Sequence, residues 1–325
     1  MIKVHCFVSC VCEVIKKTPG VDHRPFYFGV WDADFSVSEQ KVLSYHSEHT
    51  QHDNFKSWYQ LLYGVEIKPW YDDQQSKQHN IATLVEMVET KPTERNIMVM
   101  LDMYHLPERE NKFNQNPFPH FVMLETTDDP DIWFMWDPDF RWEGPLPKNR
   151  ILNAINQPTV GGGYYFDAID IQHTSEDTVK AYFAQSMKLT QNPFTDALRQ
   201  IVTSHLDDDR FVLSELDTAL REIPVMAIRK YAFEHAFAYF WEALSLNEDE
   251  FENWCDEIES LVNGYTQLQY RCMKLAMIGN PDLATAVFDL LDLQDQREFA
   301  IKHKLQQVFE QWSELSQPTS VLAHA

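Results

Sequence analysis

Pro117-Phe118-Pro119-His120-Phe121-Val122-Met123-Leu124 is typical of a buried β-strand, and a second apolar run closes with Trp136-Asp137-Pro138. The polar turn 126–131 between these runs predicts an antiparallel hairpin. His120 opens one strand and Asp137 ends the other, so we expect their side chains at the same end of the hairpin, about 5 Å apart if they are directly opposite. A carboxylate that orients an imidazole supplies two members of a catalytic triad, the base and the residue that holds it. The third member, the nucleophile, must come from another part of the chain.

Cys6 is the candidate nucleophile. Apolar residues recur at helical spacing over 3–17, and Pro19-Gly20 ends the pattern. Cys6 falls in the first turn of this predicted helix, where the helix dipole favours a thiolate. Free cysteines are usually small buried hydrophobes, and we adopt that interpretation for Cys10 and Cys12. For Cys6 the structural and the catalytic interpretations are both kept.

The composition limits the kinds of partner that this chain is expected to bind. The chain has 325 residues, of which 44% are hydrophobic, and a formal net charge of −23. This charge argues against nucleic acid and against anionic membranes as partners, and it favours a cationic ligand. The alternative is that the charge only keeps an ordinary acidic protein in solution.

The five cysteines lack the spacing of a disulfide framework or of a zinc site, so we expect reduced thiols and no metal. The short apolar run from Cys6 to Cys12 meets Glu13, Lys16 and Lys17 and makes a poor signal peptide. No stretch is long enough to span a membrane. We therefore predict a cytoplasmic protein.

The first half of the chain mixes helices with strands, and the second half is helical. We predict an α+β fold with an antiparallel sheet in residues 1–172, followed by an all-α domain in 173–325. The elements predicted in the first half are strands at Phe26–Trp31, Val65–Tyr71, 96–104 and Tyr164–Ile169, and helices at Phe55–Tyr63, Ile81–Glu89 and from Pro147. The helices predicted in the second half are Asp177–Leu189, Pro193–His205, Ser214–Glu222, Val225–Leu244, Asp249–Val262, Leu268–Ile278, Leu283–Leu291 and Gln296–Leu315, before a frayed tail at Gln317–Ala325.

Several local motifs recur together in one family. They are His5-Cys6 at a helix start, Phe28-Gly29, Asp102-Met103-Tyr104-His105-Leu106-Pro107, Pro119-His120-Phe121-Val122 and Trp136-Asp137-Pro138. Together they resemble the butirosin biosynthesis protein H family of papain-like cysteine acyltransferases. Longer runs are similar to the members of that family that act in petrobactin-type siderophore biosynthesis; these runs are His23-Arg24-Pro25, Trp31-Asp32-Ala33-Asp34-Phe35 and the segment 106–117.

The resemblance implies a reaction and its partners. A 3,4-dihydroxybenzoyl group would pass from an acyl carrier protein thioester, through Cys6, to a primary amine of spermidine or of a spermidine-citrate intermediate. His120 would serve as the base and Asp137 as its orienter. The resemblance implies no cofactor of the chain's own, because the phosphopantetheine belongs to the partner carrier protein.

Four residues are predicted to bind the amine: Asp102, Tyr104, Asp32 and Glu108. The excess of carboxylates suits a polycationic acceptor, although a buried Asp102 is equally consistent with a structural role. An acidic carrier protein would need a basic patch, for which Arg229, Lys230, Arg271 and Lys274 are candidates. The helical half has three open roles, which are covering the site, docking the carrier protein and forming a homodimer.

Two alternative functions follow from the same residues. The first is a papain-like cysteine amidase or peptidase, in which water replaces the amine. The second is a non-catalytic scaffold that binds a carrier protein or a polyamine.

Overall fold

The chain forms two compact units in a computed structural model that describes residues 4–46, 52–110, 114–169 and 171–315. The first unit comprises Met1–Phe26, Asp34–Ser36 and Tyr45–Thr174, and the second comprises Tyr27–Ala33, Val37–Ser44 and Ser175–Ala325. The domain division at residues 172 and 173 stays a prediction. Two short segments from the N-terminal part of the chain, Tyr27–Ala33 and Val37–Ser44, belong to the helical second unit. The predicted tail at Gln317–Ala325 lies outside the described residues.

The first unit is built on an antiparallel sheet. Within the described ranges its strands have the order β3-β8-β4-β5-β6-β7. The central strand β5 pairs with β4, where Leu101 lies opposite His120, and with β6, where Met123 lies opposite Trp136. The strand bounds are β3 Lys68–Pro69, β4 Arg95–Asp102, β5 Pro119–Thr126, β6 Ile132–Asp137, β7 Trp142–Pro147 and β8 Gly163–Asp167. A separate pair, β1 Ser36–Val37 and β2 Leu43–Ser44, belongs mostly to the second unit.

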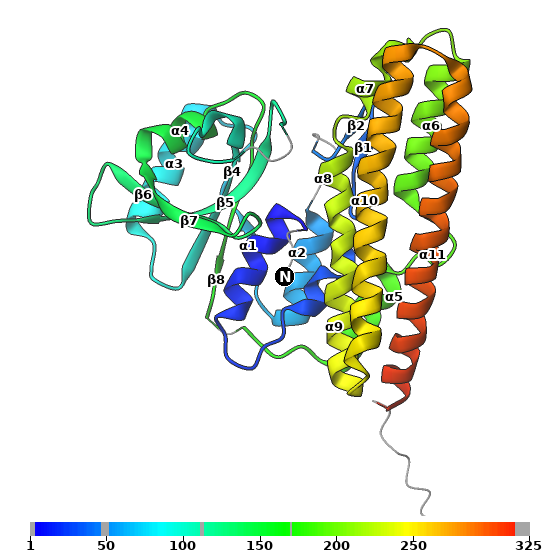
Figure 1. Cartoon of the computed structure of the whole chain (residues 1–325). Helices are drawn as coiled ribbons and strands as arrows, with labels where there is room; N and C mark the ends of the chain where they lie inside the picture. Colours follow the sequence, from blue (N-terminus) through cyan, green and yellow to red (C-terminus); the bar gives the residue numbers. More distant parts are fainter. Residues whose placement is uncertain (1–3, 47–51, 111–113, 170, 316–325) are drawn as a thin grey trace, which may run out of the picture. The chain divides into compact units, whose positions relative to one another are not determined.

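Helices cover both faces of β5, which explains why this strand is almost continuously apolar. Phe121 points toward α1, where its ring lies 5.7 Å from that of Phe7. Val122 points the other way and is also fully buried. In Figure 1 α1 (dark blue) lies against β5 and β6, while α3 packs against β5 and α4 against β4. The helices of this unit are α1 Cys6–Lys16, α2 Asp53–Tyr63, α3 Lys77–Thr90 and α4 Lys148–Ile155.

The helices of the first unit begin and end where local signals place them. Ser76 caps α3, because its Oγ accepts the backbone N–H of His79 at 3.1 Å. Gly64 ends α2 in the left-handed region at φ 75°, which glycine adopts at little cost. The sequence-based prediction of an α+β fold is confirmed by this sheet and by the helical second unit.

The second unit is a set of helices dominated by a long antiparallel pair, α10 and α11 (yellow to red in Figure 1). None of the helices among the described residues is both long and apolar enough to cross a bilayer. The helix bounds are α5 Glu176–Ser186, α6 Pro193–Asp207, α7 Leu216–Ala219, α8 Ile223–Ala227, α9 Ala232–Leu244, α10 Glu248–Ile278 and α11 Ala284–Leu315.

The strand predicted at Phe26–Trp31 is wrong. Residues 24–29 form a turn of 3₁₀ helix, and most of this aromatic run belongs to the second unit. There Phe28 packs edge-on against Phe183 at 5.6 Å, and Trp31 stacks on Phe233 at 4.8 Å. The aromatic composition thus reflects packing onto helices and not pairing in a sheet.

Further boundaries also differ from the sequence-based prediction; for example, the helix predicted at Val225–Leu244 is two helices, α8 and α9. The strand predicted at Val65–Tyr71 pairs over Lys68–Pro69 alone. The helices predicted at Asp249–Val262 and Leu268–Ile278 are one helix, α10, and those predicted at Leu283–Leu291 and Gln296–Leu315 are one helix, α11. Asn263-Gly264 is therefore not a break. A Cβ at Gly264 would lie 2.1 Å from the Oε1 of Gln294, so this glycine lets α11 approach closely.

Candidate active site

The hairpin brings His120 and Asp137 together. Both side chains are buried, and His120 Nε2 lies 2.9 Å from Asp137 Oδ1. The pairing of Met123 with Trp136 places Asp137 beside Val122, two positions from His120 on the same face of the sheet. The predicted contact is present, and it is made diagonally across the hairpin and not directly opposite.

Cys6 is the first residue of α1, and it is partly exposed. A buried carboxylate just beyond β6 fixes the start of this helix. Asp139 Oδ1 accepts hydrogen bonds from the backbone N–H groups of Val4 (3.2 Å) and His5 (3.1 Å), and from Ser9 Oγ (2.7 Å). Because Asp139 follows Asp137 in the chain, it ties the end of the hairpin to the start of the Cys6 helix.

The imidazole of His120 connects these two elements. Besides its contact with Asp137, the ring lies close enough to Cys6 for the cysteine side chain to influence its charge. Since Nε2 faces Asp137, the nitrogen available to Cys6 is Nδ1. Cys6, His120 and Asp137 are hereafter called the candidate triad; the structure pairs His120 with Asp137 and places Cys6 where it influences the imidazole.

The electrostatics of the candidate triad favour a charged imidazole. Burial opposes the imidazolium, but the Asp137 carboxylate and the Cys6 side chain outweigh burial and raise the pKa of His120 well above 6.5. Burial likewise opposes the Asp137 carboxylate, but His120 and Arg109 outweigh it and lower the pKa of Asp137. The cluster is built to hold an imidazolium–carboxylate pair.

Sequence reasoning missed two buried groups beside the candidate triad. Arg109 donates from Nη2 to Asp137 Oδ2 at 2.7 Å, and Asp139 holds the start of α1 as described above. Arg109 stands in a loop crowded with charges, and Asp139 in an acidic turn, so nothing local distinguishes either from solvated residues. The one available signal is position, because Arg109 lies within the segment 106–117 and Asp139 directly follows Trp136-Asp137-Pro138.

Of the predicted amine-binding residues, Asp102 is fully engaged inside the first unit. Its Oδ1 accepts from the backbone N–H groups of Tyr104 (3.1 Å) and Phe118 (2.9 Å), and its Oδ2 accepts from Thr159 Oγ1 (2.9 Å). Asp102 therefore joins the two ends of the segment 103–118. Tyr104 is half exposed, and Glu108 forms an ion pair with Arg150 at the surface.

Asp32 belongs to the helical unit and not to the unit of the candidate triad. Its two oxygens accept from Lys230 Nζ and Lys302 Nζ, each at 2.9 Å. Glu298 completes this buried lysine cluster, at 2.7 Å from Lys230. Lys230 and Arg229 are buried, so neither can belong to a basic docking surface, whereas Arg271 and Lys274 are exposed.

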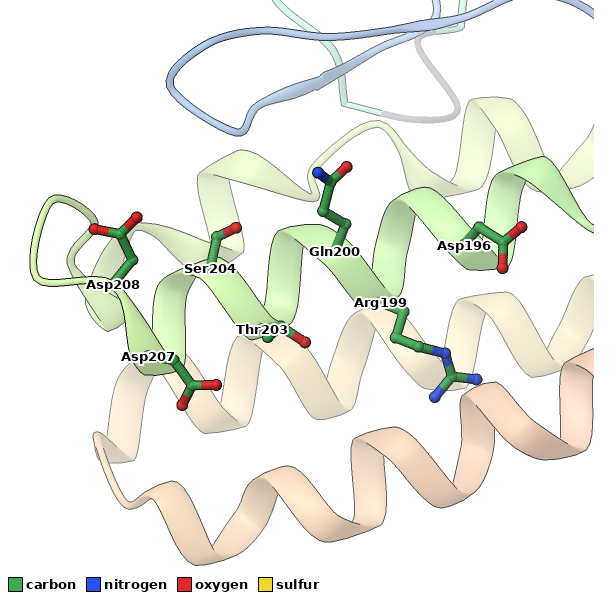
Figure 2. Close-up of a pocket in the computed structure, with 7 residues that line it drawn as sticks. All are labelled: Asp196, Arg199, Gln200, Thr203, Ser204, Asp207 and Asp208. Carbon is green, nitrogen blue, oxygen red and sulfur yellow. The ribbon is translucent and has the colours of Figure 1, made fainter.

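The helical unit also carries a shallow hollow along α6 (Figure 2). Its single cationic side chain, Arg199, is held by Asp292 at 2.8 Å and Asp295 at 3.1 Å, both on α11. The lining contains no cysteine or histidine, so the candidate triad remains the site with nucleophilic chemistry. The residues that line the hollow are Asp196, Arg199, Gln200, Thr203, Ser204, Asp207 and Asp208. Within the described ranges, no cluster of three or more potential ligands is arranged to hold a metal ion.

The first unit is thus an α+β unit in which a helix-start cysteine meets a histidine and an aspartate on a sheet. Comparison with known proteins assigns the chain to a family. The chain belongs to the DUF6005 family, because residues 1–171 match the DUF6005 N-terminal domain and residues 177–324 match the DUF6005 C-terminal domain. One similar protein is the petrobactin synthase of Bacillus anthracis, which is 44% identical over 322 residues, covering 99% of this chain and 98% of that protein.

Proposed function

We propose that this chain is a biosynthetic enzyme of petrobactin siderophore assembly, and that it forms an amide by acyl transfer through Cys6. The similarity to petrobactin synthase over nearly the full length of both chains supports the biosynthetic role. The buried His120–Asp137 pair, with the Cys6 side chain acting on the same imidazole from a helix start, is the single observation that supports the covalent mechanism. The acyl group is 3,4-dihydroxybenzoyl on an acyl carrier protein, and the acceptor is spermidine or a spermidine-citrate conjugate.

The first half-reaction loads the enzyme. His120 accepts the thiol proton of Cys6, and the thiolate attacks the carbonyl carbon of the carrier thioester. The bond to the carrier's phosphopantetheine sulfur breaks, and the imidazolium returns its proton to that sulfur. Thioester exchange is nearly neutral in free energy, so this acyl-enzyme forms reversibly. The backbone N–H of Cys6, at a helix N-terminus, is the natural donor to the oxyanion.

The second half-reaction transfers the acyl group. The neutral amine attacks the acyl-Cys6 carbonyl and His120 takes a proton from the nitrogen. The carbon–sulfur bond then breaks, and the imidazolium gives that proton to the sulfur, which restores the Cys6 thiol. The amide is more stable than the thioester, which drives the reaction forward. Alkylammonium groups titrate near pH ~10.4, so the amine must lose a proton before it can attack. His120 can accept a proton only while its ring is neutral, so its raised pKa makes transfer depend on the pH at which the ring gives up its own proton.

The acceptor is a polycation, and the chain offers a net charge of −23 to attract it. In this proposal Asp102, Tyr104, Asp32 and Glu108 remain the predicted amine-binding residues. Tyr104 and Glu108 have surface to offer a substrate, whereas Asp32 and Asp102 already hold internal partners. The amine contacts are therefore expected first from Tyr104 and Glu108.

Intact-mass analysis with acyl-loaded carrier protein tests the mechanism. The wild type should gain one 3,4-dihydroxybenzoyl mass, and spermidine should discharge it as an amide. Cys6→Ala should gain no mass and lose transfer by about a thousandfold or more. Cys255→Ala is the matched control: this other partly exposed cysteine lies on α10, and burial raises its pKa to about 12, so it stays a thiol.

The same measurement separates the alternative functions. Release of free 3,4-dihydroxybenzoate in the presence of spermidine would favour a cysteine amidase, for which water is the acceptor. Binding of the carrier protein with no adduct and no turnover would favour a scaffold. Full turnover by Cys6→Ala would contradict the covalent mechanism.

A further inference from the structure

Arg109 is a buried cation that contacts the carboxylate of the candidate triad. Its side chain is 6% exposed, and Nη2 donates to Asp137 Oδ2 at 2.7 Å. The guanidinium carbon also lies 4.1 Å from the centre of the Trp142 ring on β7. This stacking fixes the plane of the guanidinium, which is a property that arginine has and lysine lacks.

The segment that carries Arg109 is fixed at both ends by one residue. Asp102 Oδ1 accepts from the N–H groups of Tyr104 and Phe118, which stand near the beginning and the end of the segment 103–118. The Arg109 backbone N–H in turn donates to the Leu106 carbonyl at 2.9 Å. The position of the guanidinium is thus set by the fold and not by a chance surface contact.

Each oxygen of Asp137 has a separate charged or ionisable partner. Oδ1 faces His120 Nε2 and also accepts the N–H of Phe140 at 3.2 Å, while Oδ2 is taken by Arg109. A carboxylate with one oxygen fixed by a guanidinium cannot rotate freely about its Cβ–Cγ bond. It therefore presents Oδ1 to the imidazole in a single orientation.

We propose that Arg109 is a positioning residue of the acyl transfer, which fixes the Asp137 carboxylate and offsets its charge beside His120. The inference rests on the proposed function, because it assigns Arg109 a role through the same triad. It adds a fourth member to the cluster, one that touches neither substrate nor nucleophile.

Three charged or titratable groups act on the His120 ring: Cys6 from α1, Asp137 from β6 and Asp139 beyond β6. Arg109 acts on the ring only through Asp137. Removing the guanidinium leaves one more net negative charge in this buried cluster. Negative charge stabilises the imidazolium, so the ring would hold its proton more tightly and release it at a higher pH. The ring would then be a poorer acceptor for the thiol proton or the amine proton at neutral pH.

Arg109→Gln and Arg109→Lys separate charge from geometry. We expect Arg109→Gln to move the pH dependence of transfer upward by about 0.5 to 1 pH unit and to lower the rate at pH 7 by about tenfold or more. Arg109→Lys keeps the charge, so its profile should stay at the wild-type pH while its maximum falls severalfold, since a point-like ammonium cannot stack on Trp142 or hold the carboxylate plane. Arg95→Gln is the control, because it breaks an arginine–aspartate pair, with Asp167, on the same sheet but at the surface and away from the candidate triad.

A second readout needs no acyl transfer. The rate of Cys6 alkylation by iodoacetamide, followed by peptide mass spectrometry against pH, should show the same upward shift in Arg109→Gln and none in Arg95→Gln. If the wild type transfers no acyl group but the alkylation profile still shifts, the proposed function fails and the role of Arg109 stands. If Arg109→Gln loses rate with an unmoved profile, or Arg109→Lys shifts as far as Arg109→Gln, the positioning role through charge is overturned.

Discussion

At the scale of single residues, His120 carries the electrostatic character of the site. Burial alone would lower its pKa, yet the Asp137 carboxylate and the Cys6 side chain raise it well above the ordinary value of 6.5. A histidine whose folded pKa exceeds its unfolded pKa contributes stability that is complete below the unfolded value. That contribution declines as the pH rises and is gone above the folded pKa.

Replacing this histidine should therefore change stability in a pH-dependent way. We expect the difference in free energy of unfolding between the wild type and His120→Gln to be largest below about pH 6.5 and to shrink steadily at higher pH. Urea unfolding at half-unit pH steps measures this difference. His173→Gln, an exposed histidine of the same unit, should show no such trend, and a constant difference for His120→Gln would contradict the ion-pair description.

At the scale of elements, the start of α1 depends on Asp139. Its carboxylate satisfies the N–H groups of Val4 and His5 and the hydroxyl of Ser9, and it does so 130 residues or more along the chain from each. The N-cap residue of this helix is His5, and its side chain makes no capping hydrogen bond. Asp139 thus takes the place of a local N-cap and couples the Cys6 helix to the hairpin.

Asp139→Ala should release these three donors into a buried site. Each unsatisfied buried group costs roughly 1–3 kcal/mol, so we expect about 3 kcal/mol or more of destabilisation together with slower alkylation of Cys6. Ser9→Ala removes one donor and its need for a partner at once, and should cost about 1 kcal/mol. Equal effects of the two variants in urea unfolding would contradict the capping role.

Elements with a clear pattern of apolar residues could be predicted from the sequence. Elements whose conformation depends on packing against residues far along the chain could not. The hairpin from Pro119 to Asp137 was visible because a central strand buried on both faces needs an apolar run. The aromatic run at Phe26–Trp31 has the same composition but packs on helices of the second unit, and composition does not distinguish these settings. At Gly264 a turn-like dipeptide serves close packing of two helices, a requirement set by Gln294 far along the chain.

The same limit applies to the site. His120 and Asp137 were predictable because both lie at strand ends, and Cys6 because it opens a helix. Arg109 and Asp139 were not, since a charged residue in a polar segment has no local sign of burial. Asp32 was expected among amine ligands, but its partners Lys230 and Lys302 lie 198 and 270 residues away.

At the scale of the whole molecule, the helical unit encloses a charge network. Burial opposes ionisation of Asp32, but Lys230 and Lys302 outweigh burial and lower its pKa. Glu298 supplies the second negative charge, and it accepts from Tyr265 as well. Two cations and two anions therefore balance inside the unit, and removing one leaves a buried net charge.

Asp32→Ala should consequently destabilise the protein by about 3–5 kcal/mol, measured by urea unfolding at pH 7. Because Asp32 has a lowered folded pKa, its contribution is present above its ordinary pKa of 3.8 and is lost as the pH falls through the folded value. Glu39→Ala, an exposed change in the same unit, should cost about 0.5 kcal/mol or less. A loss below about 1 kcal/mol for Asp32→Ala would show that the cluster contributes little.

The net charge of −23 makes a separate prediction for the proposed reaction. If long-range attraction gathers the polyamine, KM for spermidine should rise about threefold to tenfold between about 0.05 and 0.5 M salt, with kcat nearly constant. A neutral-tailed monoamine acceptor provides the control and should respond less. A salt-independent KM for spermidine would assign recognition to short-range contacts alone.

The early segment Tyr27–Ala33 folds with the helices of the second half of the chain. Exchange of one half of the gene between relatives would therefore separate residues that pack together. A crossover between relatives near codon 174 would leave Lys230 and Lys302 facing a foreign residue at position 32, and Phe183 and Phe233 facing foreign aromatic neighbours. Such a chimera keeps both sets of elements but mismatches the helical interior. A chimera that keeps the helical interior matched therefore has to take this early segment and the late half from the same parent.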